Sequence, residues 1–145
     1  MTEVPPPVPW AELRAAARAA AERAYAPYSG VRVGAAALVD DGRIVVGCNV
    51  ENASIGLTTC AENGVASALA ATGGGRLVAL AVVAGDGAYL APCGRCRQVL
   101  SEFADAGMVI DAGPTTVTLG ELLPGAFGAA DMVARRDPAP GTGEG

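Results

Sequence analysis

Three cysteines occur in two short motifs, and each motif stands where a helix is expected to begin. Cys60 is followed two residues later by Glu62, while Cys93 and Cys96 have the spacing C-x-x-C. Zinc prefers thiolate ligands in a tetrahedron, and a catalytic zinc keeps only three protein ligands, which leaves the fourth place for water. If both motifs begin helices, the two N-termini stabilise thiolates at a common point. We therefore expect a fold that brings residues 60 and 93–96 together.

Glu62 lies in the same first helical turn as Cys60. Its carboxylate would point away from the ligand direction but stay close to a water held at the metal. Such a carboxylate can take a proton from the water and pass it to a leaving amine. We predict Glu62 as the catalytic acid and base, since three cysteines with a non-ligand glutamate resemble the site of zinc deaminases.

The composition limits the kinds of catalysis, metal site and partner that the chain can have. The 145 residues suit one domain, aromatic residues make up only 4%, and the core must therefore consist of small aliphatic side chains. Histidine is absent, which excludes Ser-His-Asp and Cys-His catalysis and any histidine-ligated metal. The formal charge of −5, with arginine as every basic residue, disfavours a nucleic-acid polymer as partner.

The N-terminus lacks the pattern of a secretory signal. It begins with Thr2 and Glu3 and continues with prolines at positions 5, 6, 7 and 9. The longest apolar run, residues 77–84, is too short to span a bilayer. We expect a cytoplasmic protein with reduced thiols and no membrane partner.

The order of predicted elements indicates a three-layer α/β/α domain with a mixed sheet of about five strands. We predict a flexible N-terminus over residues 1–9, the domain over 10–134 and a disordered tail over 135–145. Thr58 or Thr59 is expected to cap the second helix. The predicted helices span 10–24, 60–71 and 93–105, with one turn at 121–123, and the predicted strands span 31–39, 43–49, 77–84, 108–111 and 115–119.

Asn49 and Glu51 stand at the end of the second predicted strand. Side chains alternate between the two faces of a strand, so both point to one side while Cys48 and Val50 point to the other. The pattern predicts a polar pair that faces a common space, although a solvated strand end would show the same pattern.

Three other interpretations of the cysteines compete with the catalytic one. The motif Cys93–Cys96 is also typical of a redox dithiol, and Cys48 could complete a structural zinc site with four ligands. Cys48 and Cys60 could also be small core residues. The joint presence of Cys-x-Glu and Pro-Cys-x-x-Cys favours the catalytic zinc site. On this interpretation Cys48 is a buried residue that does not bind the metal.

At the level of whole motifs, the sequence resembles the small, homotetrameric type of cytidine deaminase. The similar stretches follow the family's order and spacing over nearly everything from Trp10 to Met132. They are Ala26–Ser29, Arg32–Ala36, Gly47–Ser54, Cys60–Glu62, Pro92–Leu100 and Glu121–Pro124.

The resemblance implies a reaction and a metal. Zn²⁺ would be held by Cys60, Cys93 and Cys96, with proton transfer by Glu62 and no organic cofactor. The implied activity is hydrolytic deamination of free cytidine and 2′-deoxycytidine to the uridine compounds with release of ammonia, as in pyrimidine salvage.

The resemblance also implies the substrate contacts. Asn49 and Glu51 would hold the ribose hydroxyls, and backbone groups around Ala61 would read the pyrimidine edge. Phe127 would pack near the base and reach a neighbouring subunit's pocket in a homotetramer. Val31 stands where the family usually has a phenylalanine that contacts the base.

Two further positions depart from the family pattern. Ile55 stands where a tyrosine is common, and Asn63 replaces the arginine often found after Cys-Ala-Glu. Three thiolates on a divalent cation carry a net charge of −1, which Asn63 cannot offset, although Arg95 or Arg97 could if either folds back. We expect an active enzyme, although not necessarily a fast one. One alternative is a deaminase of another amino-heterocycle, such as a blasticidin-type cytosine nucleoside, and the alternative from another class is a non-enzymatic zinc or redox module.

Overall fold

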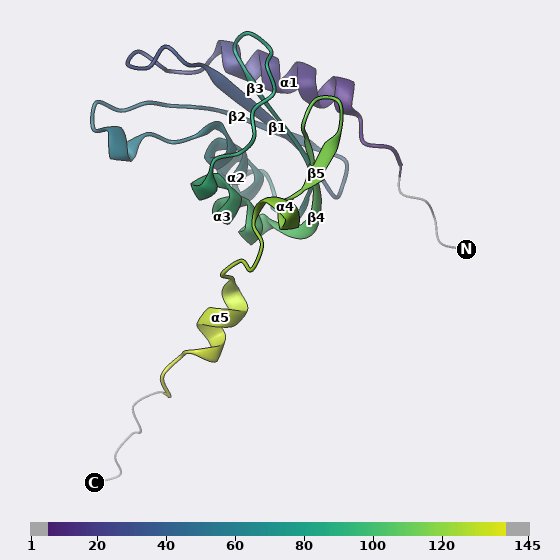
Figure 1. Ribbon diagram of the computed structural model, residues 1–145, viewed down its shortest axis with the longest axis vertical. Coiled ribbons are helices and arrows are strands. Elements are labelled where there is room, and N and C mark those ends of the chain that lie inside the picture. Colours follow the sequence, from purple (N-terminus) through teal and green to yellow (C-terminus); the bar gives the residue numbers. More distant parts are fainter. Residues whose placement is uncertain (1–5, 139–145) are drawn as a thin grey trace.

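The computed structural model describes residues 6–138 and shows a five-stranded sheet between two layers of helices. Helix α1 covers one face of the sheet, and α2, α3 and α4 lie on the other (Figure 1). The predicted three-layer α/β/α fold with a mixed sheet is confirmed. The predicted flexible N-terminus and disordered tail lie in part outside the described residues, at 1–5 and 139–145.

The sheet has the order β2-β1-β3-β4-β5, with β3 in the centre. Among the adjacent strands of this sheet, only the pair β3–β4 is parallel, while β1 pairs antiparallel with both β2 and β3, and β5 pairs antiparallel with β4. The predicted hairpin at 40–42 therefore joins β1 to β2, and the apolar run 77–84 is the central strand. The strands are β1 (Val33–Val39), β2 (Ile44–Cys48), β3 (Leu77–Ala84), β4 (Ala104–Asp111) and β5 (Thr116–Thr118).

Helix α1 (Trp10–Glu22) follows Pro9 and buries Leu13, Ala17 and Ala20 against the sheet. Its alanine face allows close packing, and Gly34 of β1 makes that packing possible. A Cβ at position 34 would overlap the backbone oxygen of Ala17. The smallest side chains on both elements thus bring helix and sheet into backbone contact.

The opposite face of the sheet carries the two cysteine motifs. Helix α2 (Ala61–Ala71) packs on β2 and β1, and α3 (Gly94–Phe103) packs beside α2. Their apolar side chains meet those of β1, β3 and β4 in the larger core cluster, which includes Val65, Leu69 and Leu100. Helix α4 (Leu119–Leu122) closes this cluster with Leu119.

Several element limits differ from the prediction. Cys60 itself is the residue before α2, so the prediction of Thr58 or Thr59 as its cap is wrong. Helix α3 ends at Phe103 instead of 105, because β4 begins at Ala104, four residues earlier than predicted, where Ala104 pairs with Leu77 of β3. Pairing across the sheet overrides the local helical pattern there.

Two short helices were not predicted. The 3₁₀ turn η1 (Ile55–Leu57) lies in a loop between β2 and α2 that projects from the body, and α5 (Ala129–Ala134) extends away from it towards the C-terminus (Figure 1). Neither helix buries a residue, and each spans only three to six residues, which is too short for an apolar periodicity to be recognised in the sequence. Within residues 6–138, none of the helices combines the length and hydrophobicity needed to cross a bilayer.

Candidate metal centre and active site

The three predicted ligands meet at the adjoining ends of α2 and α3. The Sγ atoms of Cys60 and Cys93 are 3.9 Å apart, those of Cys93 and Cys96 are 3.5 Å apart, and all three lie within 4.8 Å of one another. A tetrahedral zinc with Zn–S distances of about 2.3 Å requires sulfurs about 3.8 Å apart. The spacing of the thiols therefore fits a zinc ion.

The two helices begin directly at these cysteines. Cys60 precedes α2 and Cys93 precedes α3, so the positive ends of both helix dipoles face the sulfurs. The backbone N–H of Cys96 donates to the sulfur of Cys93 and lowers the pKa of that thiol. Burial raises the pKa values of Cys60 and Cys96, so these two thiols depend on a bound cation to ionise.

Glu62 lies beside the thiols and is only 4% exposed. Its Oε2 is 3.5 Å from the sulfur of Cys96. Burial raises the pKa of the carboxyl group above its ordinary value, which brings it closer to the range in which a group both accepts and donates protons. The structure thus places a protonatable carboxyl at the edge of the metal site without making it a ligand.

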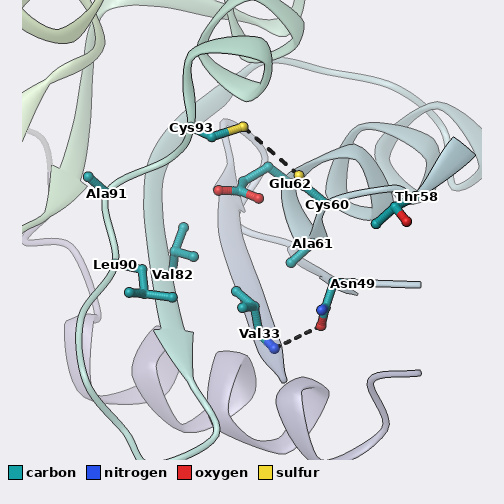
Figure 2. A pocket seen from close by; sticks show the side chains of 10 residues that line it. All are labelled: Val33, Asn49, Thr58, Cys60, Ala61, Glu62, Val82, Leu90, Ala91 and Cys93. Carbon is teal, nitrogen blue, oxygen red and sulfur yellow. Dashed lines mark hydrogen bonds between the residues drawn. The ribbon is translucent and has the colours of Figure 1, made fainter. Parts of the chain in front are cut away.

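A cavity of about 210 Å³ opens in front of Glu62. Figure 2 shows Cys60 and Cys93 at one end with Glu62, and Asn49 at the other end. Its walls are Val33, Asn49, Thr58, Cys60, Ala61, Glu62, Val82, Leu90, Ala91 and Cys93. A planar heterocycle with polar groups on one edge matches this combination of polar and aliphatic walls.

A second cavity, of about 480 Å³, shares Thr58 and Cys60 with the first. Glu51 lies in it beside Tyr28 and Ser29. The carboxylate accepts hydrogen bonds from the Ser29 hydroxyl and from the backbone N–H groups of Tyr28 (2.9 Å) and Ser29 (3.1 Å). These bonds, the Ser29 hydroxyl first, lower the pKa of Glu51 and keep it ionised.

Asn49 lines the first cavity and Glu51 lines the second. Their orientation does not come from the strand alternation that was predicted. Strand β2 ends at Cys48, so both residues follow it in irregular chain. The Asn49 amide donates to the carbonyl of Val31 and accepts from the N–H of Val33, both at 2.8 Å. The start of β1 therefore orients Asn49, while each polar atom of its amide keeps capacity for one more hydrogen bond.

Two predicted substrate contacts, Val31 and Phe127, do not line the first cavity, and neither does Ile55, a position that departs from the family pattern. Val31 is 53% exposed and is not in its wall, where Val33 lies instead. Ile55 is 81% exposed in η1 and borders the second cavity. Phe127 is 57% exposed, and its carbonyl accepts a hydrogen bond from Gln98 of α3.

Two arginines in the first turns of α3 bind backbone carbonyl groups. Arg97 donates from Nε to the carbonyl of Pro92 and from Nη1 to that of Leu122, at 2.8 and 2.9 Å. Arg95 donates to the carbonyl of Thr58 at 3.4 Å. Within residues 6–138 neither has a carboxylate partner, so both bring positive charge to the ligand-bearing turn.

Comparison with known proteins identifies this arrangement. Residues 11–112 match the family model described as the cytidine and deoxycytidylate deaminase zinc-binding region. The chain belongs to the cytidine deaminase family. Zn²⁺ is therefore its metal cofactor, and the cluster of three thiols, which fits that ion, is the candidate site.

Individual relatives agree with this family. A cytidine deaminase from Mycobacterium tuberculosis is 58% identical over 131 residues, which cover 90% of this chain and 98% of that protein. One from Halalkalibacterium halodurans is 46% identical and covers 78% of this chain and 89% of that protein. A crystal structure of cytidine deaminase from M. tuberculosis gives a TM-score of 0.82, at 60% identity, over 84% of this chain and 99% of that chain.

Membership of the cytidine deaminase family decides between the competing interpretations of the cysteines. In the part of the chain that the structure covers, the cluster contains three cysteines and leaves out Cys48, so the four-cysteine site is wrong. The family's zinc-binding region also argues against a redox dithiol.

Sequence reasoning missed the aliphatic wall of the first cavity. Val33 could have been found, since it begins the run of β1 and packs against the larger core. Leu90 and Ala91 precede the Pro92–Cys93 motif directly and had no signal beyond that position.

Proposed function

We propose that this chain catalyses the hydrolytic deamination of cytidine and 2′-deoxycytidine to uridine and 2′-deoxyuridine, with release of ammonia. The observation that carries the proposal is the position of Glu62. It is a buried carboxyl group with a raised pKa, 3.5 Å from a cluster of three thiols spaced for zinc, at the end of a small cavity.

The chain's residues divide the chemistry between them. Zinc, when bound by Cys60, Cys93 and Cys96, supplies a Lewis acid that lowers the pKa of water. Glu62 takes a proton from the attacking water and passes it to N3 as the water oxygen bonds to C4 and the C4–N3 double bond opens. The same carboxyl group then takes the proton of the C4 hydroxyl group and gives it to the amino group as the C4–N bond breaks, so that C4=O forms and ammonia leaves.

Substrate orientation follows from the two cavities. With C4 at Glu62, the polar edge of the base lies against the backbone around Ala61, and the sugar extends towards the second cavity. Asn49, at the end of the first cavity, and Glu51, in the second, form hydrogen bonds with ribose hydroxyl groups. Both side chains are already held by the segment 28–33, which reduces the entropy lost on binding.

The substrate is a free nucleoside rather than a nucleotide or a polymer. Glu51 remains ionised next to the sugar site and would repel a 5′-phosphate. The chain's net charge of −5 also opposes a polyanion. Turnover of cytidine monophosphate or single-stranded DNA at a rate comparable with cytidine would contradict this part.

A second candidate is a related amino-heterocycle, such as a blasticidin-type cytosine nucleoside. The observation that favours it is the second cavity, which at about 480 Å³ is larger than the first and is bordered by the aliphatic Ile55. A substrate panel followed by ultraviolet absorbance distinguishes the two substrate classes.

We also propose that the enzyme is a cytoplasmic homotetramer that serves pyrimidine salvage, with residues 10–134 as its domain. Exposed apolar side chains on α5 and just before it support contacts between subunits; they are Phe127, Met132 and Val133. Phe127 of one subunit would then complete the base pocket of a neighbour.

The change Glu62→Gln tests the mechanism. It keeps the shape of the side chain but removes proton transfer, so kcat should fall by about 10²-fold or more while zinc content and folding stay unchanged. Bound zinc per chain and circular dichroism are the controls. Near wild-type turnover in this variant would overturn the role of Glu62.

A further inference from the structure

The wall of the first cavity opposite Ala61 is made of aliphatic side chains. They are Val33, Val82, Leu90 and Ala91 (Figure 2). A cytosine ring has one polar edge, with O2, N3 and the 4-amino group, and one apolar edge, with C5 and C6. If the polar edge faces Ala61 and Glu62, as the proposed function requires, the C5–C6 edge lies against the aliphatic wall.

The part of this wall formed by Leu90 and Ala91 is thin. A further cavity of about 290 Å³ lies behind it and is lined by the same two residues together with Tyr89, Ile110 and Val117. Leu90 packs against the edge of the larger core, but residues 90–91 border a cavity on each side, so close packing fixes this part of the wall only in part. A backbone hydrogen bond from Leu90 to the carbonyl of Val82, at 3.1 Å, holds its middle.

Tyr89 fixes the outer end of the same segment. The guanidinium of Arg14 on α1 lies over its ring, 5.4 Å from the ring centre. On another side the ring contacts Gly113, where a Cβ would come within 3.0 Å of the ring carbons and where φ is +86°. The ring is thus held between α1 and the β4–β5 turn.

A buried aspartate fixes Arg14 in turn. The arginine Nε and Nη2 donate to the two carboxylate oxygens of Asp111 at 2.7 and 3.1 Å, and the Asp111 side chain is fully buried. The N–H of Gly113 also donates to Asp111, at 3.2 Å. Because the pair is bidentate and the aspartate has no solvent contact, Arg14 has little freedom to leave the tyrosine ring.

We propose that Arg14 and Tyr89 are positioning residues that set the width of the base pocket through Leu90 and Ala91. They hold the wall against the C5–C6 edge and so make the enzyme discriminate against cytosine nucleosides that carry a substituent on C5. The inference rests on the proposed function for the orientation of the base. Neither residue touches the substrate.

The substitution Tyr89→Ala tests this, with Tyr89→Phe as the matched control that keeps the ring. Tyr89 is 42% exposed, so both variants should fold. A pocket that excludes one methyl group discriminates by about 10-fold or more, and Tyr89→Ala should reduce the preference for cytidine over 5-methylcytidine by about fivefold, mainly through KM. Tyr89→Phe should retain the wild-type preference.

A second variant and a second measurement keep the test decisive. Arg14→Lys retains the ion pair but loses the planar group over the ring, and it should shift the preference in the same direction by a smaller factor. The Kd ratio of the products uridine and 5-methyluridine gives the pocket width without any turnover. An unchanged ratio in both folded variants would overturn the inference, whereas absent cytidine turnover with a shifted Kd ratio would refute only the proposed function.

Discussion

Asn63 is the residue at which the active-site motif departs from the pattern expected for the family. It follows Glu62 in the first turn of α2, and its buried Oδ1 has no hydrogen-bond partner within residues 6–138. Asn63 brings no charge to a cluster of three thiolates, whereas Arg95 and Arg97 bind carbonyl oxygens of the neighbouring turns. The cationic side chains next to the cysteine motifs therefore belong to α3, which carries the C-x-x-C motif, and not to α2.

The substitution Asn63→Arg should therefore increase kcat. A guanidinium at this position would reduce the net negative charge of the cluster, which strengthens the metal as a Lewis acid. We expect an increase of about threefold to tenfold, equivalent to roughly 1 kcal/mol of barrier. Steady-state kinetics with zinc-saturated protein measure it, and an equal or lower kcat would show that Arg95 and Arg97 already supply the needed charge.

The position of α2 on the sheet controls where the side chains of the active site lie. Gly47 of β2 lies directly against the first turn of α2, where a Cβ would overlap the backbone oxygen of Ala61. A Cβ on Gly64 of the helix would in turn come within 3.0 Å of the Gly47 backbone. The two glycines let the turn that carries Cys60 and Glu62 rest on the strand backbone.

The substitution Gly47→Ala should displace that turn. Overpacking of this kind costs about 1–3 kcal/mol, and the movement of Glu62 should reduce kcat/KM by about 10-fold or more. Gly34→Ala is the matched control, because it overlaps Ala17 of α1 on the opposite face. Denaturant unfolding should show comparable losses for both variants, while comparable losses of kcat/KM would refute the role of Gly47.

For the whole molecule, many of the exposed apolar groups lie away from the sheet core. Tyr28 and Ile55 line the second cavity at the projecting loop, and Phe127, Met132 and Val133 lie on or beside α5. Helix α5 buries none of its own residues and extends away from the body (Figure 1). A chain that exposes such side chains gains stability by covering them with a second copy.

Light scattering after size exclusion should give four times the 14.3 kDa mass of one chain. The substitution Phe127→Ala should raise KM for cytidine if this residue completes a neighbour's pocket, and Met132→Ala, on the same segment, serves as the control. A monomeric mass with full cytidine activity would contradict both the tetramer and the shared pocket.

Local patterns in the sequence were enough to predict the chemistry and most of the elements. Residue types at short spacing decide where α2 and α3 begin, and these starts place the three cysteines and Glu62 at or next to first helical turns. The apolar run of β3 and the turn residues before β2 likewise needed no tertiary information. Local spacing is sufficient because each of these features depends on neighbours within one turn or one hairpin.

How these pieces meet depends on the packing of the whole domain. The separation of 3.9 Å between the sulfurs of Cys60 and Cys93 results from the way two helices pack on one sheet face, which no local pattern contains. The early start of β4 and the wall at Leu90 and Ala91 depend in the same way on pairing and contacts across the sheet. Contacts between residues far apart in sequence therefore set the shape of the substrate pocket, because only close packing of the folded chain brings its walls together.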